Sequence, residues 1–385
     1  MNLDLVLLSV SLLTWGIGEG MFLIFQPIYL QQMGANTMTI AGVLGLFGLA
    51  MMVAHIPAGF LADRIGRKPL LVTAWVLGIL AALIMGLART LPVLILGIML
   101  YGFTAFVTSP MNSYITAARG KMSPVRAMTL VSAIYNVGAI LGPVSGGWIG
   151  ERLGLRSVYL VSAGLFTVST VVLFFLRAQA REAHDPAAPP ESLWRNTRFI
   201  SFLGIIFLAV FVMYLPQPLT PRFLQNERGL SLESIGLLGS VGSLGNAVLA
   251  LGLGQIAARS GFLLAQVAVA AFSLLLWKGS GLGWYGLGFF LLGGFRSVRS
   301  LIYAQVRPLI HPAQMGLAYG IAETASALAV MLAPLLAGVL YTVEPGMVYW
   351  VSAALIALML VVSGIFAPRQ AGSAEPTIRI VPPEG

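Results

Sequence analysis

The chain alternates between long apolar runs and short polar breaks. Most runs are close to the roughly 20 residues that a helix needs to cross the ~30 Å hydrocarbon core of a bilayer. A helix also satisfies its own backbone hydrogen bonds in that environment. The pattern predicts an all-α membrane protein with twelve transmembrane helices, at residues 5–30, 39–61, 69–88, 91–116, 127–150, 157–176, 199–223, 234–257, 262–279, 282–306, 315–341 and 347–367.

The longest polar break separates the sixth run from the seventh. It covers residues 177–198 and is rich in Pro, Ala and charged residues, a composition typical of a surface linker. We therefore predict two six-helix bundles joined by this linker. The predicted boundaries are 1–176 for the N-terminal bundle, 177–198 for a cytoplasmic linker, 199–368 for the C-terminal bundle and 369–385 for a cytoplasmic tail.

Three stretches of the first half recur in the second half, in the same order and at an offset of 191 to 195 residues. Parallel repeats of this kind are typical of transporters built from two similar bundles. The recurring pairs are Gly42, Gly45 and Gly48 with Gly236, Gly239 and Gly242, residues 59–66 with 254–261, and residues 142–147 with 333–338.

The composition favours a membrane protein over a soluble one. Of the 385 residues, 58% are hydrophobic and 9% are charged, and the mean hydropathy is +0.91, whereas soluble domains carry about a quarter charged residues. The net charge of +9 does not indicate a nucleic-acid partner, because the basic residues stand singly between apolar runs. The expected partners are the lipid bilayer and a small-molecule substrate, and we expect a monomer.

The sequence lacks the residue patterns that usually carry enzymatic or metal chemistry. The chain has no cysteine, and it contains no zinc-binding spacing, nucleotide-binding loop or catalytic triad. We therefore expect no metal site, no cofactor and no enzymatic activity.

The distribution of basic residues predicts the topology. Of the 22 Lys and Arg residues, fourteen fall on the side that holds the termini and the linker, six fall on the opposite side, and two lie inside a span. Because cytoplasmic loops are enriched in Lys and Arg, we expect an inner-membrane protein with both termini in the cytoplasm. The first run lacks a basic leader and a small-residue cleavage site, so we expect it to be retained as a helix.

The sequence GFLADRIGRKPLL at residues 59–71 resembles the loop motif between helices 2 and 3 of the major facilitator superfamily. Its glycines permit a tight reversal, and its acid and three cations can form a charge network that breaks when the bundles rock. The resemblance implies that Asp63 and Arg67 latch the cytoplasmic side shut. The second copy has Ala258 in place of the acid. The expected latch residues are Gly59, Asp63, Arg64, Gly66, Arg67 and Lys68.

The sequence GAILGPVSGG at residues 138–147 resembles the fifth-helix antiporter motif of the drug-efflux branch of the same superfamily. A proline there kinks the helix, and the glycines let another helix approach its backbone. The resemblance implies the twelve-helix fold of this superfamily and a drug:proton antiporter, with H⁺ as the coupling ion. Thr129 and Ile98 depart from the branch's pattern, the latter where an arginine is expected. The motif residues are Gly138, Gly142, Pro143, Gly146 and Gly147.

Four charged residues, Glu19, Arg296, Arg299 and Glu323, lie well inside predicted spans. A charge at the bilayer centre costs about 2.5–3.5 kcal/mol even on the lenient insertion scale, so we expect these residues to line a cavity or to pair. The superfamily resemblance places helices 1, 4, 7 and 10 around a central cavity. The candidate proton or substrate site comprises Glu19, Gln26, Tyr101, Asn112, Asn136, Arg296, Arg299, Tyr303 and Glu323.

These residues support more than one function. In the first hypothesis, Glu19 and Glu323 bind protons or cations, and the protein exports a small amphipathic compound by proton-coupled alternating access. Glu323 could instead form a permanent ion pair with Arg299. In the second hypothesis, Arg296 and Arg299 bind an organic anion, because two guanidinium groups on one face suit a carboxylate or phosphate. A third reading is a membrane scaffold or receptor that transports nothing.

Overall fold

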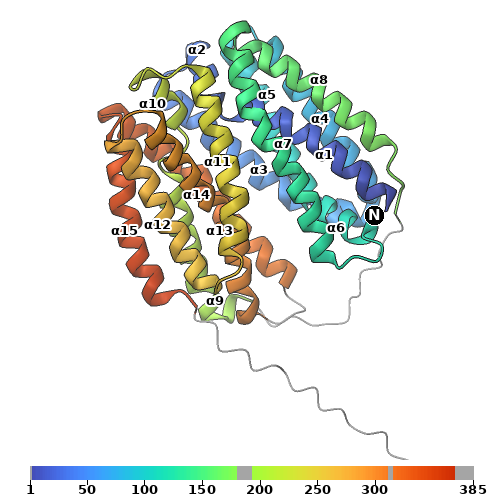
Figure 1. Ribbon diagram of the computed structural model, residues 1–385. Coiled ribbons are helices and arrows are strands. Elements are labelled where there is room, and N and C mark those ends of the chain that lie inside the picture. Colours follow the sequence, from blue (N-terminus) through green and yellow to red (C-terminus); the bar gives the residue numbers. More distant parts are fainter. Residues whose placement is uncertain (1, 180–192, 311–314, 369–385) are drawn as a thin grey trace, which may run out of the picture.

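The computed structural model describes residues 2–179, 193–310 and 315–368, and these residues are almost entirely helical (Figure 1). The first half contains α1 (Leu3–Leu23), α2 (Gln26–Gln32), α3 (Thr37–Ile65), α4 (Arg67–Leu87), α5 (Leu91–Phe103), the 3₁₀ turn η1 (Thr104–Val107), α6 (Thr108–Ala118), α7 (Pro124–Leu153) and α8 (Leu155–Phe174). The second half contains η2 (Leu193–Arg195), α9 (Thr197–Tyr214), α10 (Thr220–Asn226), α11 (Leu232–Leu253), α12 (Ala258–Lys278), α13 (Leu282–Val306), η3 (Arg307–Leu309), α14 (Met315–Val343) and α15 (Met347–Phe366).

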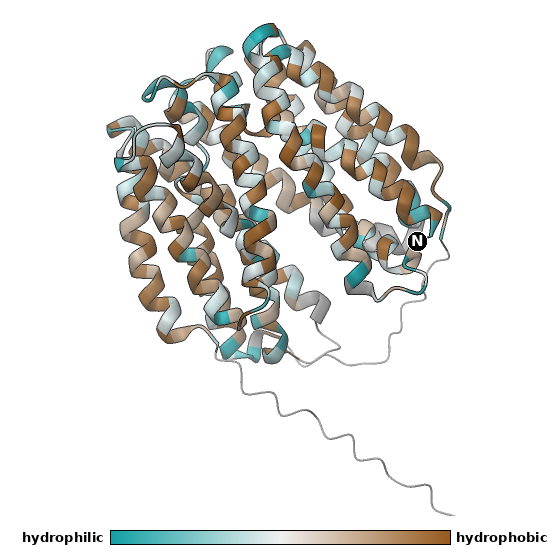
Figure 2. Ribbon diagram, in the orientation of Figure 1, coloured by the Kyte–Doolittle hydropathy of each residue, from teal (hydrophilic) through white to brown (hydrophobic). Residues whose placement is uncertain are grey.

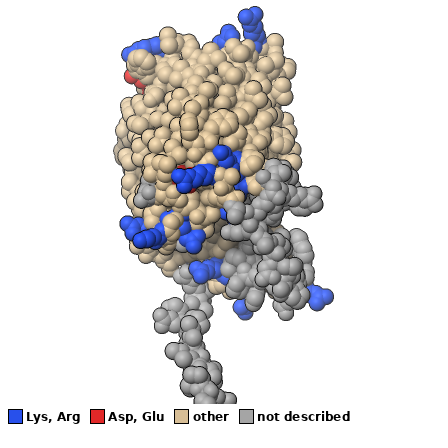
Figure 3. Space-filling view, turned by 90° about the vertical axis from the view of Figure 1, so that its right-hand side faces the viewer, with Lys and Arg blue, Asp and Glu red and all other residues tan. Residues whose placement is uncertain are grey.

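The helices have the lengths and the surfaces of membrane spans. In the described part of the chain, eleven helical segments are long and apolar enough to cross a membrane, with α5, η1 and α6 counted as one. The 25-residue α13, which carries Arg296 and Arg299, is the twelfth long helix. Apolar residues extend along the outer helices in Figure 2, and Figure 3 shows one face as a largely uncharged field with most Lys and Arg toward its two ends. The predicted all-α membrane fold is confirmed.

The first span of each half is interrupted, which the sequence analysis did not predict. The run at 5–30 forms α1 and α2, and the run at 199–223 forms α9 and α10. Pro27 and Pro221 occupy the first turns of α2 and α10. Proline lacks the N–H that a continuous helix needs, so each long run ends as one helix and restarts as a short one.

The two halves form separate bundles that meet at one end. In Figure 1, α1 to α8 lie on one side and α9 to α15 on the other, and the bundles diverge toward the end where the N-terminus lies. We call this the linker end, because α8 ends and α9 begins there. At the far end, α7 packs against α11 and α3 packs against α14.

Glycine allows the backbones to touch at both of these crossings. A Cβ atom on Gly147 of α7 would lie 2.5 Å from the Leu232 carbonyl oxygen of α11, and one on Gly45 of α3 would lie 2.7 Å from the Met331 carbonyl oxygen of α14. Such distances leave no room for a side chain. The recurring glycine stretches thus form two similar contacts between the bundles.

Polar groups also join the bundles at the far end. The Glu151 carboxylate accepts a 2.7 Å hydrogen bond from the Leu232 backbone N–H, at the N-terminus of α11. The Arg222 guanidinium donates a 2.6 Å hydrogen bond to the Thr37 hydroxyl. A carboxylate at a helix N-terminus is favoured by the unpaired N–H groups and by the helix dipole. These bonds hold the far end closed in this conformation.

The predicted latch loop lies at the linker end. Gly66 separates α3 from α4 with a φ of 89°, a conformation that favours glycine. Arg67 donates a 3.1 Å hydrogen bond to the Gln179 side chain, and Lys68 donates one of 3.0 Å to the Phe174 carbonyl oxygen. The side chains of residues 55–65, among them Asp63 and Arg64, lie outside the described residues, as do 180–192 and 369–385. The latch and the exact bundle boundaries therefore stay predictions.

Candidate functional site

A cavity of about 430 Å³ lies within the N-terminal bundle and reaches α13 of the other bundle. Four of the predicted site residues line it: Glu19, Tyr101, Asn112 and Arg299. Its other lining side chains combine hydroxyls with aromatic rings and methionines; they include Trp15, Phe47, Met51, Trp75, Thr104, Thr108, Met111, Ser132 and Tyr135.

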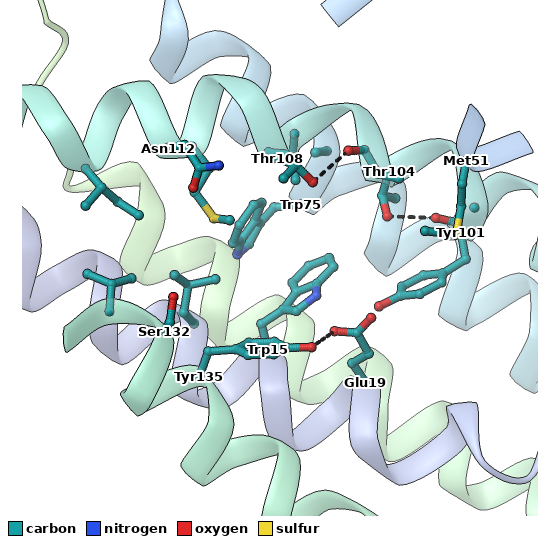
Figure 4. Close-up of a pocket in the computed structure, with 18 of the residues that line it drawn as sticks. Trp15, Glu19, Met51, Trp75, Tyr101, Thr104, Thr108, Asn112, Ser132 and Tyr135 are labelled. Atoms are coloured by element: carbon teal, nitrogen blue, oxygen red, sulfur yellow. Dashed lines mark hydrogen bonds between the residues drawn. The ribbon is translucent and has the colours of Figure 1, made fainter. Parts of the chain in front are cut away.

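Glu19 is held in this cavity by tyrosine hydroxyls rather than by a cation. The Tyr135 hydroxyl of α7 donates a 2.6 Å hydrogen bond to one carboxylate oxygen of Glu19. The Tyr101 hydroxyl points toward the same carboxylate from α5 (Figure 4). Within the described ranges, Glu19 forms no ion pair. Its carboxylate is therefore oriented, but its charge has no fixed counter-charge.

The glycines of α7 place Tyr135 beside Glu19. A Cβ atom on Gly142 would lie 2.5 Å from the Ile17 carbonyl oxygen of α1, and one on Gly16 would lie 2.6 Å from the Tyr135 carbonyl oxygen. Gly138 and Gly146 likewise touch the α1 backbone. The antiporter-like motif thus brings two helix backbones together along the turns that carry Glu19 and Tyr135. On its other face, Pro143 contacts Gly236 and Gly239 of α11.

Aromatic side chains form an apolar wall beside the carboxylate. The Trp15 ring stacks on Phe166 with centroids 4.0 Å apart, and it lies 4.7 Å from the Trp75 ring. Trp75 is fixed in turn, because its indole N–H donates to the hydroxyls of Ser11 and Ser169 at 3.0 and 2.8 Å. Trp15, Trp75 and Tyr135 were not among the residues predicted from the sequence. Trp15 could have been found, because it lies four residues before Glu19 and so shares its helix face.

The fourth span changes helix type at the cavity. Between α5 and α6, residues Thr104–Val107 form a 3₁₀ turn, and Thr104 and Thr108 line the cavity (Figure 4). Pro110 follows within α6 and has no N–H to offer the Phe106 carbonyl. Short 3₁₀ segments inside longer helices often mark functional hinges. The sequence analysis read this region as one continuous helix.

The C-terminal bundle contributes an ion pair. The Arg299 Nε lies 2.7 Å from Glu323 Oε1, and the Tyr303 hydroxyl donates a 2.6 Å hydrogen bond to the same oxygen. The side chains of Arg299 and Glu323 are 51% and 28% exposed. The structure thus brings together three predicted site residues, and it places Glu323 in the ion pair that was one of the two alternatives for it.

The remaining predicted residues lie outside the cavity lining. Gln26 is buried at the start of α2, and its amide nitrogen has no hydrogen-bond partner among the described residues. Asn136 faces the other bundle, where the Asn246 amide approaches it at 3.4 Å. Arg296 is exposed on α13, one helical turn before the cavity-lining Arg299.

The candidate site shows no metal-binding arrangement. Among the residues that the structure describes, no group of three or more His, Cys, Asp or Glu side chains gathers where it could hold a metal ion.

The sequence profile of the Major Facilitator Superfamily matches residues 8–306. The chain belongs to the Major Facilitator Superfamily. This family consists of membrane transporters rather than enzymes, and the match confirms the resemblance carried by residues 59–71 and 138–147.

Several curated relatives are similar over part of their length. The multi-drug resistance efflux pump PmrA of Streptococcus pneumoniae is 28% identical over 202 residues, which are 49% of each chain. The class C tetracycline resistance protein of Escherichia coli is 26% identical over 204 residues, 51% of each chain. The chain therefore spans about half the length of these curated relatives.

Solved structures confirm the fold over nearly the whole chain. A crystal structure of the nucleoside transporter NupG superposes with a TM-score of 0.75 over 96% of this chain and 100% of that one, at 15% identity. A bacterial homologue of the human lysosomal transporter Spinster, in an inward-facing and occupied conformation, gives 0.73 over 94% and 95%, at 15% identity. These likenesses concern the fold.

Proposed function

We propose that this protein is a secondary active transporter that exports a small amphipathic compound across the inner membrane in exchange for protons. The observation that carries the proposal is Glu19, a carboxylate inside a membrane cavity that is held by tyrosine hydroxyls and forms no ion pair with any residue that the structure describes. An ionisable residue in that position marks a proton or substrate path more often than a structural element.

The cavity suits a compound of this kind. Its volume of about 430 Å³ falls within the roughly 300–1,000 Å³ of pockets that hold drug-sized ligands. Trp15 and Trp75, both largely buried, contribute apolar surface to the lining. Glu19 supplies a negative charge, so a ligand with an apolar body and a positive group satisfies both parts of the lining.

A single carboxylate can couple the two fluxes. Glu19 can hold either a proton or the positive group of a substrate, but not both in one site. If the empty site with a charged Glu19 rarely switches between the two sides of the membrane, each substrate molecule that leaves the cell is exchanged for a proton that enters it. Competition between a proton and the substrate for Glu19 does not need the arginine that the drug-efflux branch carries in the fourth span, where this chain has Ile98.

The arrangement of the bundles suits alternating access. They touch at the far end and diverge toward the linker end (Figure 1). If both termini lie in the cytoplasm, as the basic residues predict, the cavity opens toward the cytoplasm, where an exported compound would enter. The multi-drug resistance efflux pump among the relatives supports export.

Replacing Glu19 with glutamine tests the proposal in vesicles that contain the purified protein. We expect Glu19→Gln to abolish export of a cationic dye driven by a pH gradient, because glutamine cannot exchange a proton. Glu323→Gln is the matched control, since its carboxylate is already paired, and it should retain pH-dependent export. Undiminished, still pH-dependent export by Glu19→Gln would refute the assignment.

A second candidate function is transport of an organic anion. Arg299 lines the cavity, but its charge is paired with Glu323, which leaves Arg296 as the better anion site. Anions that stabilise the parent protein against heat but not Arg296→Ala would favour this function, and cationic dyes that stabilise both would count against it. Counterflow of any solute in vesicles would dismiss a scaffold or receptor.

A further inference from the structure

The proposed export of a cationic compound gives no role to Arg296, a charged residue of the C-terminal bundle. This residue lies on α13 one helical turn before Arg299, so the two side chains share a helix face. Arg299 lines the cavity and is bound by Glu323 and Tyr303. In the part of the chain that the structure describes, Arg296 forms no hydrogen bond and no ion pair.

The helix face of α13 connects Arg296 to the cavity. Arg299 lines the cavity together with Glu19, and the exposed Arg296 lies one helical turn before Arg299, just beyond the lining. Glu19 accepts the 2.6 Å hydrogen bond from Tyr135, and Arg299 is already paired with Glu323. Among the described residues, Glu19 is thus an acid without an ion pair inside the cavity, and Arg296 is a base without an ion pair one turn from its lining.

An unpaired arginine in a membrane span becomes costly once water leaves it. When the bundles close at the linker end, the Arg296 guanidinium must find a negative partner or remain in a wet space. Glu19 needs a positive partner under the same conditions. A purely cationic ligand neutralises Glu19 but places a second positive charge near Arg296. A purely anionic ligand neutralises Arg296 but places a second negative charge near Glu19.

We propose that the substrate is zwitterionic, with its positive group at Glu19, its negative group at Arg296 and its apolar body against Trp15 and Trp75. This inference rests on the proposed function, because it takes Glu19 as the site of the positive group. It joins the cation and anion hypotheses into one ligand with two charges. Both side chains are then neutralised in the closed state without a direct contact between Glu19 and Arg296.

The test uses a series of phenyl-bearing amino acids in which one to four methylene groups separate the ammonium from the carboxylate. Each member is compared with its methyl ester, which is only cationic, and its N-acetyl derivative, which is only anionic. Binding is measured on the purified full-length protein by thermal stabilisation. We expect at least one zwitterion to bind more tightly than both of its derivatives.

Variants show which residue binds each charged group of the ligand. Arg296→Gln should weaken binding of the preferred zwitterion about tenfold to a hundredfold, the loss of one charge-assisted contact, and should leave its ester bound as tightly as before or more tightly. Glu19→Gln should weaken both the zwitterion and the ester. The control Lys278→Gln removes an exposed positive charge at the end of α12, outside the cavity lining, so it should keep the preference for the zwitterion.

Two results would overturn the zwitterion proposal. One is an ester that binds as tightly as its zwitterion at every spacing, and the other is no stabilisation by any zwitterion at millimolar concentration. If esters bind through Glu19 but zwitterions bind no better, the proposed function survives and the zwitterion proposal alone fails. If Arg296→Gln weakens esters and zwitterions equally, Arg296 acts on the structure and not on the ligand's negative group.

Discussion

Glu19 and Glu323 are both carboxylates within membrane-spanning helices, but the two bundles surround them differently. Glu19 faces a cavity and is bound by tyrosine, whereas Glu323 shares one oxygen between Arg299 and Tyr303. Both carboxylates therefore accept a short tyrosine hydrogen bond, and they differ in the cation. A carboxylate inside a membrane span is therefore not necessarily a proton site. What distinguishes Glu19 is that it forms no ion pair within the described part of the chain.

The helix contacts behind the two carboxylates differ as well. In the N-terminal bundle, Gly142 and Gly146 let α7 touch the α1 backbone. The repeat places Ala333 and Ala337 at the equivalent positions of α14, and both are fully buried. Each alanine methyl keeps neighbouring backbones further apart. In the first bundle, α1 and α7 thus touch backbone to backbone along the turns that carry Glu19 and Tyr135.

Removing the tyrosine hydroxyl at Glu19 should give the largest difference between the two carboxylates. Tyr135→Phe keeps the ring but deletes a charge-assisted hydrogen bond of about 1.5–3 kcal/mol, so we expect proton-driven export to fall about tenfold or more. Tyr303→Phe is the counterpart, and Glu323 retains Arg299 there. Equal losses in the two variants, measured as initial export rates in vesicles, would contradict the distinction.

A single methyl group at the α1–α7 contact should disturb Glu19 through the backbone. In Gly142→Ala, the new Cβ atom would lie 2.5 Å from the Ile17 carbonyl oxygen, and overpacking of this kind costs about 1–3 kcal/mol. We expect a lower unfolding temperature in detergent, together with slower export. Gly164→Ala on α8 is the control, because a Cβ atom there meets nothing within 4 Å. Equal stability of the two variants would show that the helices separate without cost.

Removing the ion pair of the C-terminal bundle should have the smallest effect. Arg299→Gln/Glu323→Gln deletes two opposite charges that are 51% and 28% exposed, and exposed pairs contribute about 0–1 kcal/mol. We expect a small change in unfolding temperature and unchanged pH dependence of export. Loss of the pH dependence in this double variant would move the proton site from Glu19 to Glu323.

The sequence predicted the fold well because the bilayer restricts the possible structures. Twelve apolar runs could form only helices, and the repeated stretches indicated two similar bundles. The breaks at Pro27, Pro221 and Pro110 were not predicted, although proline can interrupt a helix. A membrane helix tolerates proline when neighbouring groups satisfy its backbone, so a proline alone does not locate a break.

The site could be predicted only in part. The charged residues stood out because they are rare in spans, and this led to Glu19, Arg299 and Glu323. Tyr135 and Trp75 could not be singled out, because their roles depend on how closely α7 and α4 approach α1. Gln26 was predicted to lie in the same continuous span as Glu19, at residues 5–30, but the break before α2 places it on a separate short helix.

Proton release on ligand binding tests the central claim, that Glu19 exchanges a proton for substrate, most directly. A ligand such as tetraphenylphosphonium is added to purified protein in weakly buffered detergent solution, over a range of starting pH, with a pH indicator dye. We predict that the parent and Glu323→Gln release protons on binding, whereas Glu19→Gln releases none. Proton release by Glu19→Gln equal to that of the parent would contradict the account.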